Sequence, residues 1–285
     1  MTDITQAMAQ SAPIYRGMDR ATLDAAYNNS AAVADSAQWL ADWRVRSGVS
    51  RALPDAQLDV RYGDRERTRF DYFPCGAPSA PLFVFIHGGY WQRNAKEMFS
   101  FVSDGPRARG VDVAVVGYTL APAARLSEIV DEIHEAIRFL GAHAGGFGFD
   151  PHRIYVGGWS AGGHLAAVAS GWPNVRGALV ISGIFDLEPI ALSYLDDPLR
   201  LSRREVANYS PINLLRPDMV PQRLSVGSNE LPELKRQAYA YEKASHQLGS
   251  SVQLRILSGH HHFSILDELA KADGELTAEL LHIIS

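Results

Sequence analysis

Ser160 has the sequence surroundings of a catalytic nucleophile. It lies between Gly158 and Gly162, after the apolar run 154–156 and at the start of a small-residue helix expected over 161–170. In this G-x-S-x-G spacing the glycines allow close approach of neighbouring chains around a strained strand-to-helix turn. The N–H groups at the start of the helix favour negative charge that develops beside the serine. The pattern therefore predicts nucleophilic attack by Ser160 on a carbonyl carbon.

A glycine pair after the apolar run 82–86 is the candidate oxyanion hole. Gly88 and Gly89 can turn backbone N–H groups towards a substrate carbonyl oxygen, with the N–H of Ala161 as their partner. One such donor contributes about 3 kcal/mol of transition-state stabilisation. The alternative is an ordinary glycine turn, and a nucleophile further along the chain favours the oxyanion hole.

Three aromatic residues next to these motifs are candidate substrate contacts. Tyr90 and Trp91 follow the glycine pair, and Trp159 precedes the serine. Large flat side chains of this kind can wall a pocket for an aromatic substrate. For Tyr90 and Trp91, burial in the core is the alternative.

The general base is expected among three consecutive histidines, His260, His261 and His262, which follow the last predicted strand. A histidine-rich tract can also bind a metal ion. Carboxylates and cysteines at ligand spacing are missing nearby, so we predict no metal site. Only one of the three can act as the base.

The acid that orients the base is expected after the penultimate strand. Glu230 lies there, and its neighbour Asn229 has no charge to stabilise an imidazolium. Asp186, one strand earlier, is the competitor. The order Ser160, Glu230, His262 is the order of serine, acid and histidine in α/β-hydrolases.

Alternating elements predict the scaffold that brings these residues together. Eight strands are expected at 58–62, 67–73, 82–86, 112–117, 154–156, 178–182, 223–227 and 252–257. Helices are expected at 95–109, 125–143, 161–170, 232–248 and 264–284, with short ones within 183–220. Alternation of this kind predicts a mainly parallel sheet with helices on both faces, beginning with a hairpin. Sites in such sheets gather at the carboxyl ends of the strands.

The first 50 residues are expected to form a helical arm, with helices over 21–34 and 36–46, ahead of a catalytic domain over 51–285. The arm either packs on that domain or caps the active site. In the second case Tyr27, Asn28 or Trp39 would touch the substrate.

Composition narrows the class of protein. Hydrophobic residues make up 46% of the 285-residue chain and charged residues 21%, as in globular proteins with one large core. A net charge of −5 gives no basic surface for nucleic acid. The single cysteine, Cys75, excludes an internal disulfide. With no signal peptide at the N-terminus and no membrane-length apolar run, we predict a cytoplasmic location.

Motifs along nearly the whole chain resemble those of the kynurenine formamidases (arylformamidases), α/β-hydrolases related to the hormone-sensitive-lipase-like esterases. They are Tyr-Asn-Asn at 27–29, His-Gly-Gly-Tyr-Trp at 87–91, Tyr-x-Leu-Ala-Pro at 118–122, Gly-Trp-Ser-Ala-Gly-Gly at 158–163, Ser-Gly-Ile-Phe-Asp-Leu-Glu-Pro at 182–189 and Ser-Pro at 210–211. Other esterases of the wider group tend to have His-Gly-Gly-Gly instead of the His-Gly-Gly-Tyr-Trp motif at 87–91.

The resemblance also implies the triad. The family's acid precedes a Ser-Pro-Glu-Phe-like run, which corresponds to 231–234 and so to Glu230. The family's histidine precedes a phenylalanine, which corresponds to His262 before Phe263. Leu231 and Leu234 depart from the pattern, and glutamate stands where some relatives have aspartate.

The activity that the resemblance implies is hydrolysis of N-formyl-kynurenine to kynurenine and formate through a Ser-His-Glu triad and a formyl-serine intermediate. No cofactor is expected, the partner is a small-molecule substrate, and a homodimer is compatible with the sequence. One alternative is a broad carboxylesterase for short-chain acyl esters or aryl amides. Another is a non-catalytic receptor, a class that tends to lose a triad member, whereas this chain retains a candidate for each.

Overall fold

The strands of the computed structural model, which describes residues 12–285, form one eight-stranded sheet. They are β1 (Gln57–Arg61), β2 (Arg69–Phe73), β3 (Ala80–Ile86), β4 (Asp112–Val116), β5 (Phe149–Trp159), β6 (Val175–Ile181), β7 (Gln222–Gly227) and β8 (Val252–Leu257). Their order in the sheet is β1-β2-β4-β3-β5-β6-β7-β8. Residues 1–11 lie outside the described residues. They include the expected start of the arm and the N-terminal segment for which no signal peptide is predicted.

The sheet is mainly parallel, as predicted. β1 and β2 form the antiparallel hairpin and β2 pairs antiparallel with β4, while all pairings from β4 through β3 to β8 are parallel. Every residue of β3 is buried, because helices cover both faces of the central strands. Ile86 at the end of β3 lies beside Gly158 of β5, which brings the glycine loop next to the serine turn.

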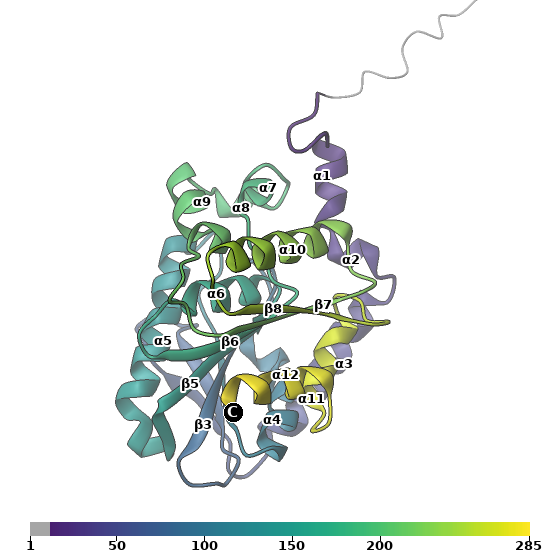
Figure 1. Ribbon diagram of the computed structural model, residues 1–285. Coiled ribbons are helices and arrows are strands. Elements are labelled where there is room, and N and C mark those ends of the chain that lie inside the picture. The colour runs from purple at the N-terminus through teal and green to yellow at the C-terminus, as the bar shows by residue number, and fades with distance from the viewer. Residues whose placement is uncertain (1–11) are drawn as a thin grey trace, which may run out of the picture.

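Helices cover the sheet on both faces (Figure 1). One face carries α5 (Leu126–Phe147), α6 (Ala161–Ala169) and α10 (Pro232–Gln247). The other carries α3 (Ser36–Arg51), α4 (Asp104–Ala108), α11 (Asp267–Ala270) and α12 (Glu275–Ile284). The excursion after β6 holds α7 (Glu188–Ala191), α8 (Asp196–Leu199) and α9 (Arg203–Tyr209). Within residues 12–285, no helix combines the length and apolar character needed to cross a membrane.

Three predicted helices are wrong as continuous helices: 21–34, 95–109 and 264–284. The first divides into α1 (Arg20–Ala26) and α2 (Asn29–Ala32), because the Asn28 side chain accepts a hydrogen bond from Ala31 N and begins a new helix. The second is two 3₁₀ turns followed by α4, since Pro106 has no N–H for a bond to the preceding turn. In the third, extended backbone at Lys271 separates α11 from α12.

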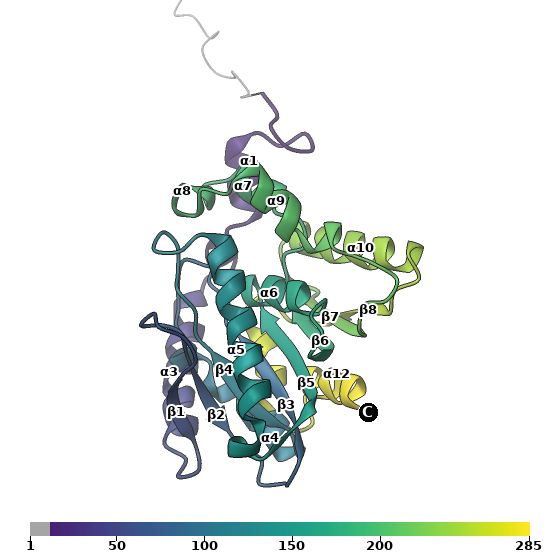
Figure 2. The ribbon, with the colours of Figure 1, turned by 90° about the vertical axis from the view of Figure 1, so that its left-hand side faces the viewer.

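The N-terminal helices pack on the body of the protein. Figures 1 and 2 show α1 close to α7, and the Asp24 carboxylate of α1 accepts a hydrogen bond from the N–H of Tyr194, which lies between α7 and α8. Trp43 of α3 is fully buried and meets Trp159 edge-on at 5.2 Å between ring centroids. The packed arrangement of the arm is therefore observed, and its division from a catalytic domain at residue 50 stays a prediction.

Two histidines are buried in the uncharged form. Burial lowers the pKa of His87 and the pKa of His164 to about 4, from an ordinary value of 6.5. His87 stacks on Tyr118 with 4.3 Å between ring centroids, and Nε2 of His164 lies 2.7 Å from the carbonyl oxygen of Tyr209. Both contacts are compatible with neutral imidazoles.

We expect these histidines to make the protein acid-sensitive. Between pH 6.5 and 4 these two histidines are protonated in the unfolded chain but remain neutral in the folded state. The free energy of unfolding therefore falls as the pH drops through this window. Each histidine contributes on the order of 3 kcal/mol at most. His164→Gln retains an N–H donor and cannot titrate. Urea unfolding at pH 7 and pH 4.5 should therefore show a smaller loss for this variant, and an equal loss in both proteins would contradict the assignment.

Candidate active site

Ser160 lies at the sharp turn between β5 and α6. Its φ of 58° and ψ of −119° are unusual for a residue with a side chain, and its N–H donates to the carbonyl of Ile181 at 2.8 Å. A Cβ on Gly158 would lie 2.4 Å from the backbone of Gly162, and one on Gly162 would lie 1.9 Å from the carbonyl oxygen of Ile86. Both glycines are therefore required by close packing, which is the local structure that the pentapeptide predicts.

Glu230 and His262 form a buried pair at the ends of β7 and β8. The Glu230 Oε2 atom lies 2.8 Å from Nδ1 of His262. Its other oxygen accepts from the Ser182 hydroxyl at 2.6 Å and from the N–H of Gly227 at 2.8 Å. The Glu230 carboxylate accepts, so Nδ1 carries the proton and donates it, and Nε2 carries a lone pair, with Nδ2 of Asn29 at 3.3 Å. An imidazole held in this way can take a proton at Nε2.

The competing acid and histidines lie elsewhere. The Asp186 carboxylate accepts hydrogen bonds from the Tyr15 hydroxyl at 3.1 Å and from the N–H of Glu188 at 3.0 Å. Nδ1 of His261 accepts from the backbone N–H of Ser264, and burial lowers the pKa of His261. Nε2 of His260 lies 3.9 Å from Glu268. Glu230 rather than Asp186 contacts His262.

A cavity of about 80 Å³ brings the predicted nucleophile and base together. Its lining residues are Asn29, Ser30, Leu40, Gly89, Tyr90, Arg93, Asn94, Trp159, Ser160, His262 and Phe263. The cavity lies at the carboxyl ends of the parallel strands, where sites in open α/β sheets are found.

The glycine loop packs directly against the serine turn. A Cβ on Gly88 would lie 2.6 Å from the Trp159 carbonyl oxygen and 3.0 Å from Cβ of Ser160. Gly89 has a φ of 122° and lines the cavity. The carbonyl of Gly88 accepts from Nδ2 of Asn94 at 3.1 Å, which holds the loop in place. Ala161 is the first residue of α6. These positions are compatible with an oxyanion hole, and that role stays a prediction.

The three candidate aromatic residues have different surroundings. Trp91 is fully buried, and its ring lies edge-on to His164 with 4.9 Å between centroids, in agreement with the core alternative. Tyr90 and Trp159 line the cavity. Burial raises the pKa of Tyr90 well above its usual value, so its hydroxyl is protonated and donates to the Tyr27 carbonyl at 2.6 Å. Nε1 of Trp159 donates to the carbonyl of His262 at 2.7 Å.

The arm contributes cavity residues that sequence reasoning missed: Asn29, Ser30 and Leu40. Of the arm residues expected near substrate, Tyr27 is fully buried, and Asn28 caps α2. Trp39 lies edge-on to His261 with 5.4 Å between ring centroids. Asn29 belongs to the Tyr-Asn-Asn motif at 27–29, so the family resemblance was the one signal that pointed to it.

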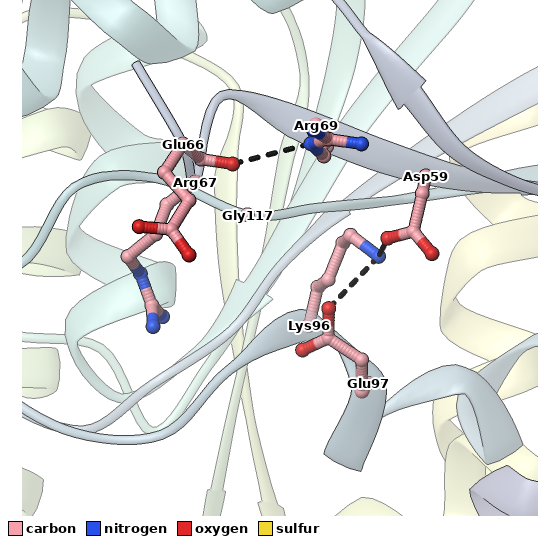
Figure 3. A pocket seen from close by; sticks show the side chains of 7 residues that line it. All are labelled: Asp59, Glu66, Arg67, Arg69, Lys96, Glu97 and Gly117. Atoms are coloured by element: carbon pink, nitrogen blue, oxygen red, sulfur yellow. Dashed lines mark hydrogen bonds and ion pairs between the residues drawn. The ribbon is translucent and has the colours of Figure 1, made fainter.

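A larger hollow of about 270 Å³ lies among charged residues (Figure 3). Nζ of Lys96 projects into this group and pairs with Asp59 at 2.7 Å and Glu97 at 3.0 Å. Lys96 is therefore paired with two of the lining carboxylates, and the lining includes none of the predicted catalytic residues. Across residues 12–285, no group of three or more histidine, cysteine or acidic side chains is arranged to hold a metal ion.

Comparisons with known proteins identify relatives of this chain. The BD-FAE family model matches residues 72–187. Kynurenine formamidase from Danio rerio is 32% identical over 260 residues, which cover 84% of this chain and 86% of the relative. The enzyme of that name from Salmo salar is 31% identical over 266 residues, with the same coverage.

A solved structure extends the likeness to the fold. A candidate thioesterase from Silicibacter sp. superposes with a TM-score of 0.79 at 28% identity, over 90% of this chain and 97% of that protein. The sheet order, the serine turn and these similarities together show that the protein is a hydrolase with the α/β-hydrolase fold and that its chain belongs to the kynurenine formamidase family.

Proposed function

We propose that the protein hydrolyses aryl formamides, and specifically N-formyl-kynurenine to kynurenine and formate. The observation that carries the proposal is the cavity whose lining holds both Ser160 and His262, with Oε2 of Glu230 2.8 Å from Nδ1 of His262. Identity to kynurenine formamidases over most of the chain supports this choice of substrate. A cavity of about 80 Å³ suits a short acyl group such as formyl.

The first half of the proposed reaction forms a formyl-serine. His262 takes the proton of the Ser160 hydroxyl at Nε2, and Oγ attacks the formyl carbon. Negative charge develops on the formyl oxygen, and the N–H groups of Gly88, Gly89 and Ala161 are the proposed donors to it. The protonated imidazole, stabilised by the Glu230 carboxylate, then gives its proton to the aniline nitrogen as the C–N bond breaks.

The second half releases formate. Water enters in place of the aniline, and His262 removes a proton from it as it attacks the formyl-serine carbon. The tetrahedral intermediate collapses, and Ser160 recovers its proton from the imidazole. Apart from the substrate and water, each step uses groups of this chain. The homodimer and the cytoplasmic location stay predictions from the sequence.

A comparison of substrates tests the choice of acyl group. We expect kcat/KM of the purified protein to be at least about tenfold higher for N-formyl-kynurenine than for 4-nitrophenyl acetate, because only the first offers an aryl formamide to the cavity. Absorbance assays of kynurenine and 4-nitrophenol give both values. A higher value for the ester would contradict the proposal and favour the second candidate.

That second candidate is a broad carboxylesterase for short-chain acyl esters or aryl amides. The likeness to the candidate thioesterase from Silicibacter sp. favours it, since thioester hydrolysis uses the same nucleophile, base and oxyanion hole. The two candidates therefore differ in leaving group and not in the first chemical step.

A further inference from the structure

The Asn29 side chain has a defined orientation in the cavity. The Tyr90 hydroxyl donates its only proton to the Tyr27 carbonyl at 2.6 Å, so towards Asn29 it can only accept. Nδ2 of Asn29 donates to that hydroxyl oxygen at 3.0 Å and lies 3.3 Å from Nε2 of His262. Both neighbours are acceptors, because the proton of His262 is on Nδ1, next to Glu230. The nitrogen of the amide therefore faces them, and the oxygen faces elsewhere.

The contact with Nε2 places Asn29 on the leaving-group side of the reaction. Nε2 must hand its proton to the leaving atom of the substrate, so that atom comes within hydrogen-bond distance of Nε2. Nδ2 of Asn29 lies 3.3 Å from Nε2 of His262. Oδ1 of Asn29 is bonded to the same carbon atom as Nδ2 and is therefore close to Nε2 as well. A leaving group that receives the proton is consequently a neighbour of the Asn29 amide.

The oxygen of the Asn29 amide lacks a hydrogen-bond donor in the described part of the chain. Oδ1 of Asn29 is buried and has no hydrogen-bond partner among residues 12–285, and the residue as a whole is 5% exposed. An unpaired buried acceptor is costly, and in a native structure it needs an explanation. A donor supplied by the substrate would satisfy it.

We propose that Asn29 is a specificity-determining residue whose Oδ1 accepts a hydrogen bond from the N–H of the scissile amide, favouring formamides over esters of the same acyl group. When Oγ of Ser160 adds to the carbonyl carbon, the amide nitrogen becomes pyramidal and turns its lone pair towards the protonated Nε2. Its N–H then points away from Nε2 and needs an acceptor, whereas an ester oxygen carries no hydrogen. The inference rests on the proposed function and specifies its leaving group.

The test compares two substrates that differ only at the leaving atom, formanilide and phenyl formate, with background hydrolysis subtracted. Asn29→Leu offers neither a donor nor an acceptor. In this variant we expect the ratio of kcat/KM for formanilide to kcat/KM for phenyl formate to fall about 30-fold. Asn29→Asp retains an oxygen acceptor and loses the donor to Nε2. Both substrates should slow in this variant, while their ratio stays within about threefold of the wild type.

The control is Asn28→Ala, which removes the neighbouring amide that caps α2 and should leave the ratio unchanged. An equal loss of kcat/KM for both substrates in Asn29→Leu would overturn the inference. If that variant does not fold, a fall of about 30-fold in the ratio for Asn29→Asp would overturn it instead. Absence of formamide turnover by the wild type would refute the proposed function as well, so the two failures are distinguishable.

Discussion

Replacement of Ser160 by alanine is expected to lower kcat for N-formyl-kynurenine by about 10⁵-fold or more, because it removes the oxygen that forms the acyl intermediate in the proposed reaction. The substitution removes one oxygen from a side chain that is 3% exposed. The turn itself is held by the Ser160 N–H bond to Ile181 and by the glycines, so the fold should persist. Initial rates and a thermal unfolding midpoint measured on the same preparation check both expectations.

A second serine provides the control for this prediction. Ser170 is also buried, at the end of α6, and its hydroxyl donates to the carbonyl of Ala167 away from the cavity. Ser170→Ala should keep kcat within about threefold of the wild type, since its effect is confined to stability. A fluorophosphonate probe should label the wild type and Ser170→Ala but not Ser160→Ala, as read by intact mass. Retained hydrolysis by Ser160→Ala would refute the mechanism.

Replacement of Glu230 by glutamine should lower kcat by about 10³- to 10⁴-fold. The amide has nearly the same shape as the carboxylate, but it cannot stabilise the imidazolium by charge. Its NH₂ group can also donate to Nδ1, which favours the tautomer with the proton on Nε2 and removes the acceptor that Ser160 needs. Because Oε1 accepts from Ser182 and from Gly227, the glutamine should keep its oxygen on that side and its nitrogen towards His262.

Asp186→Asn is the matched control for the acid. The Asp186 carboxylate is hydrogen-bonded to Tyr15 of the arm and lies outside the cavity lining. We expect kcat for this variant within about threefold of the wild type, with any loss appearing as reduced stability. Steady-state kinetics on both variants separate the two carboxylates. If only the asparagine variant were impaired, the assignment of Glu230 would be wrong.

The sequence by itself determined the nucleophile turn and the type of sheet. Around Ser160 the sequence signal is local: two glycines, an apolar strand and a small-residue helix predict the turn, and the close approach of Gly162 to Ile86 is the reason that a glycine is needed there. The alternation of strands and helices likewise predicts a parallel sheet, because each strand-helix unit folds back onto its neighbour. The breaks in the helices over 21–34 and 264–284 were missed, since local capping and tertiary contacts interrupt patterns that read as continuous.

Only the tertiary structure decided which distant side chains meet at the serine. Glu230 and Asp186 both follow strands, and it is the pairing of β7 with β8 that brings Glu230 to His262. Asn29 reaches the cavity because the arm packs across the carboxyl ends of the strands, which no local spacing encodes. Trp91 and Tyr90 are adjacent in sequence, yet one is in the core and the other lines the cavity. Neighbours in space, and not in sequence, determine these roles.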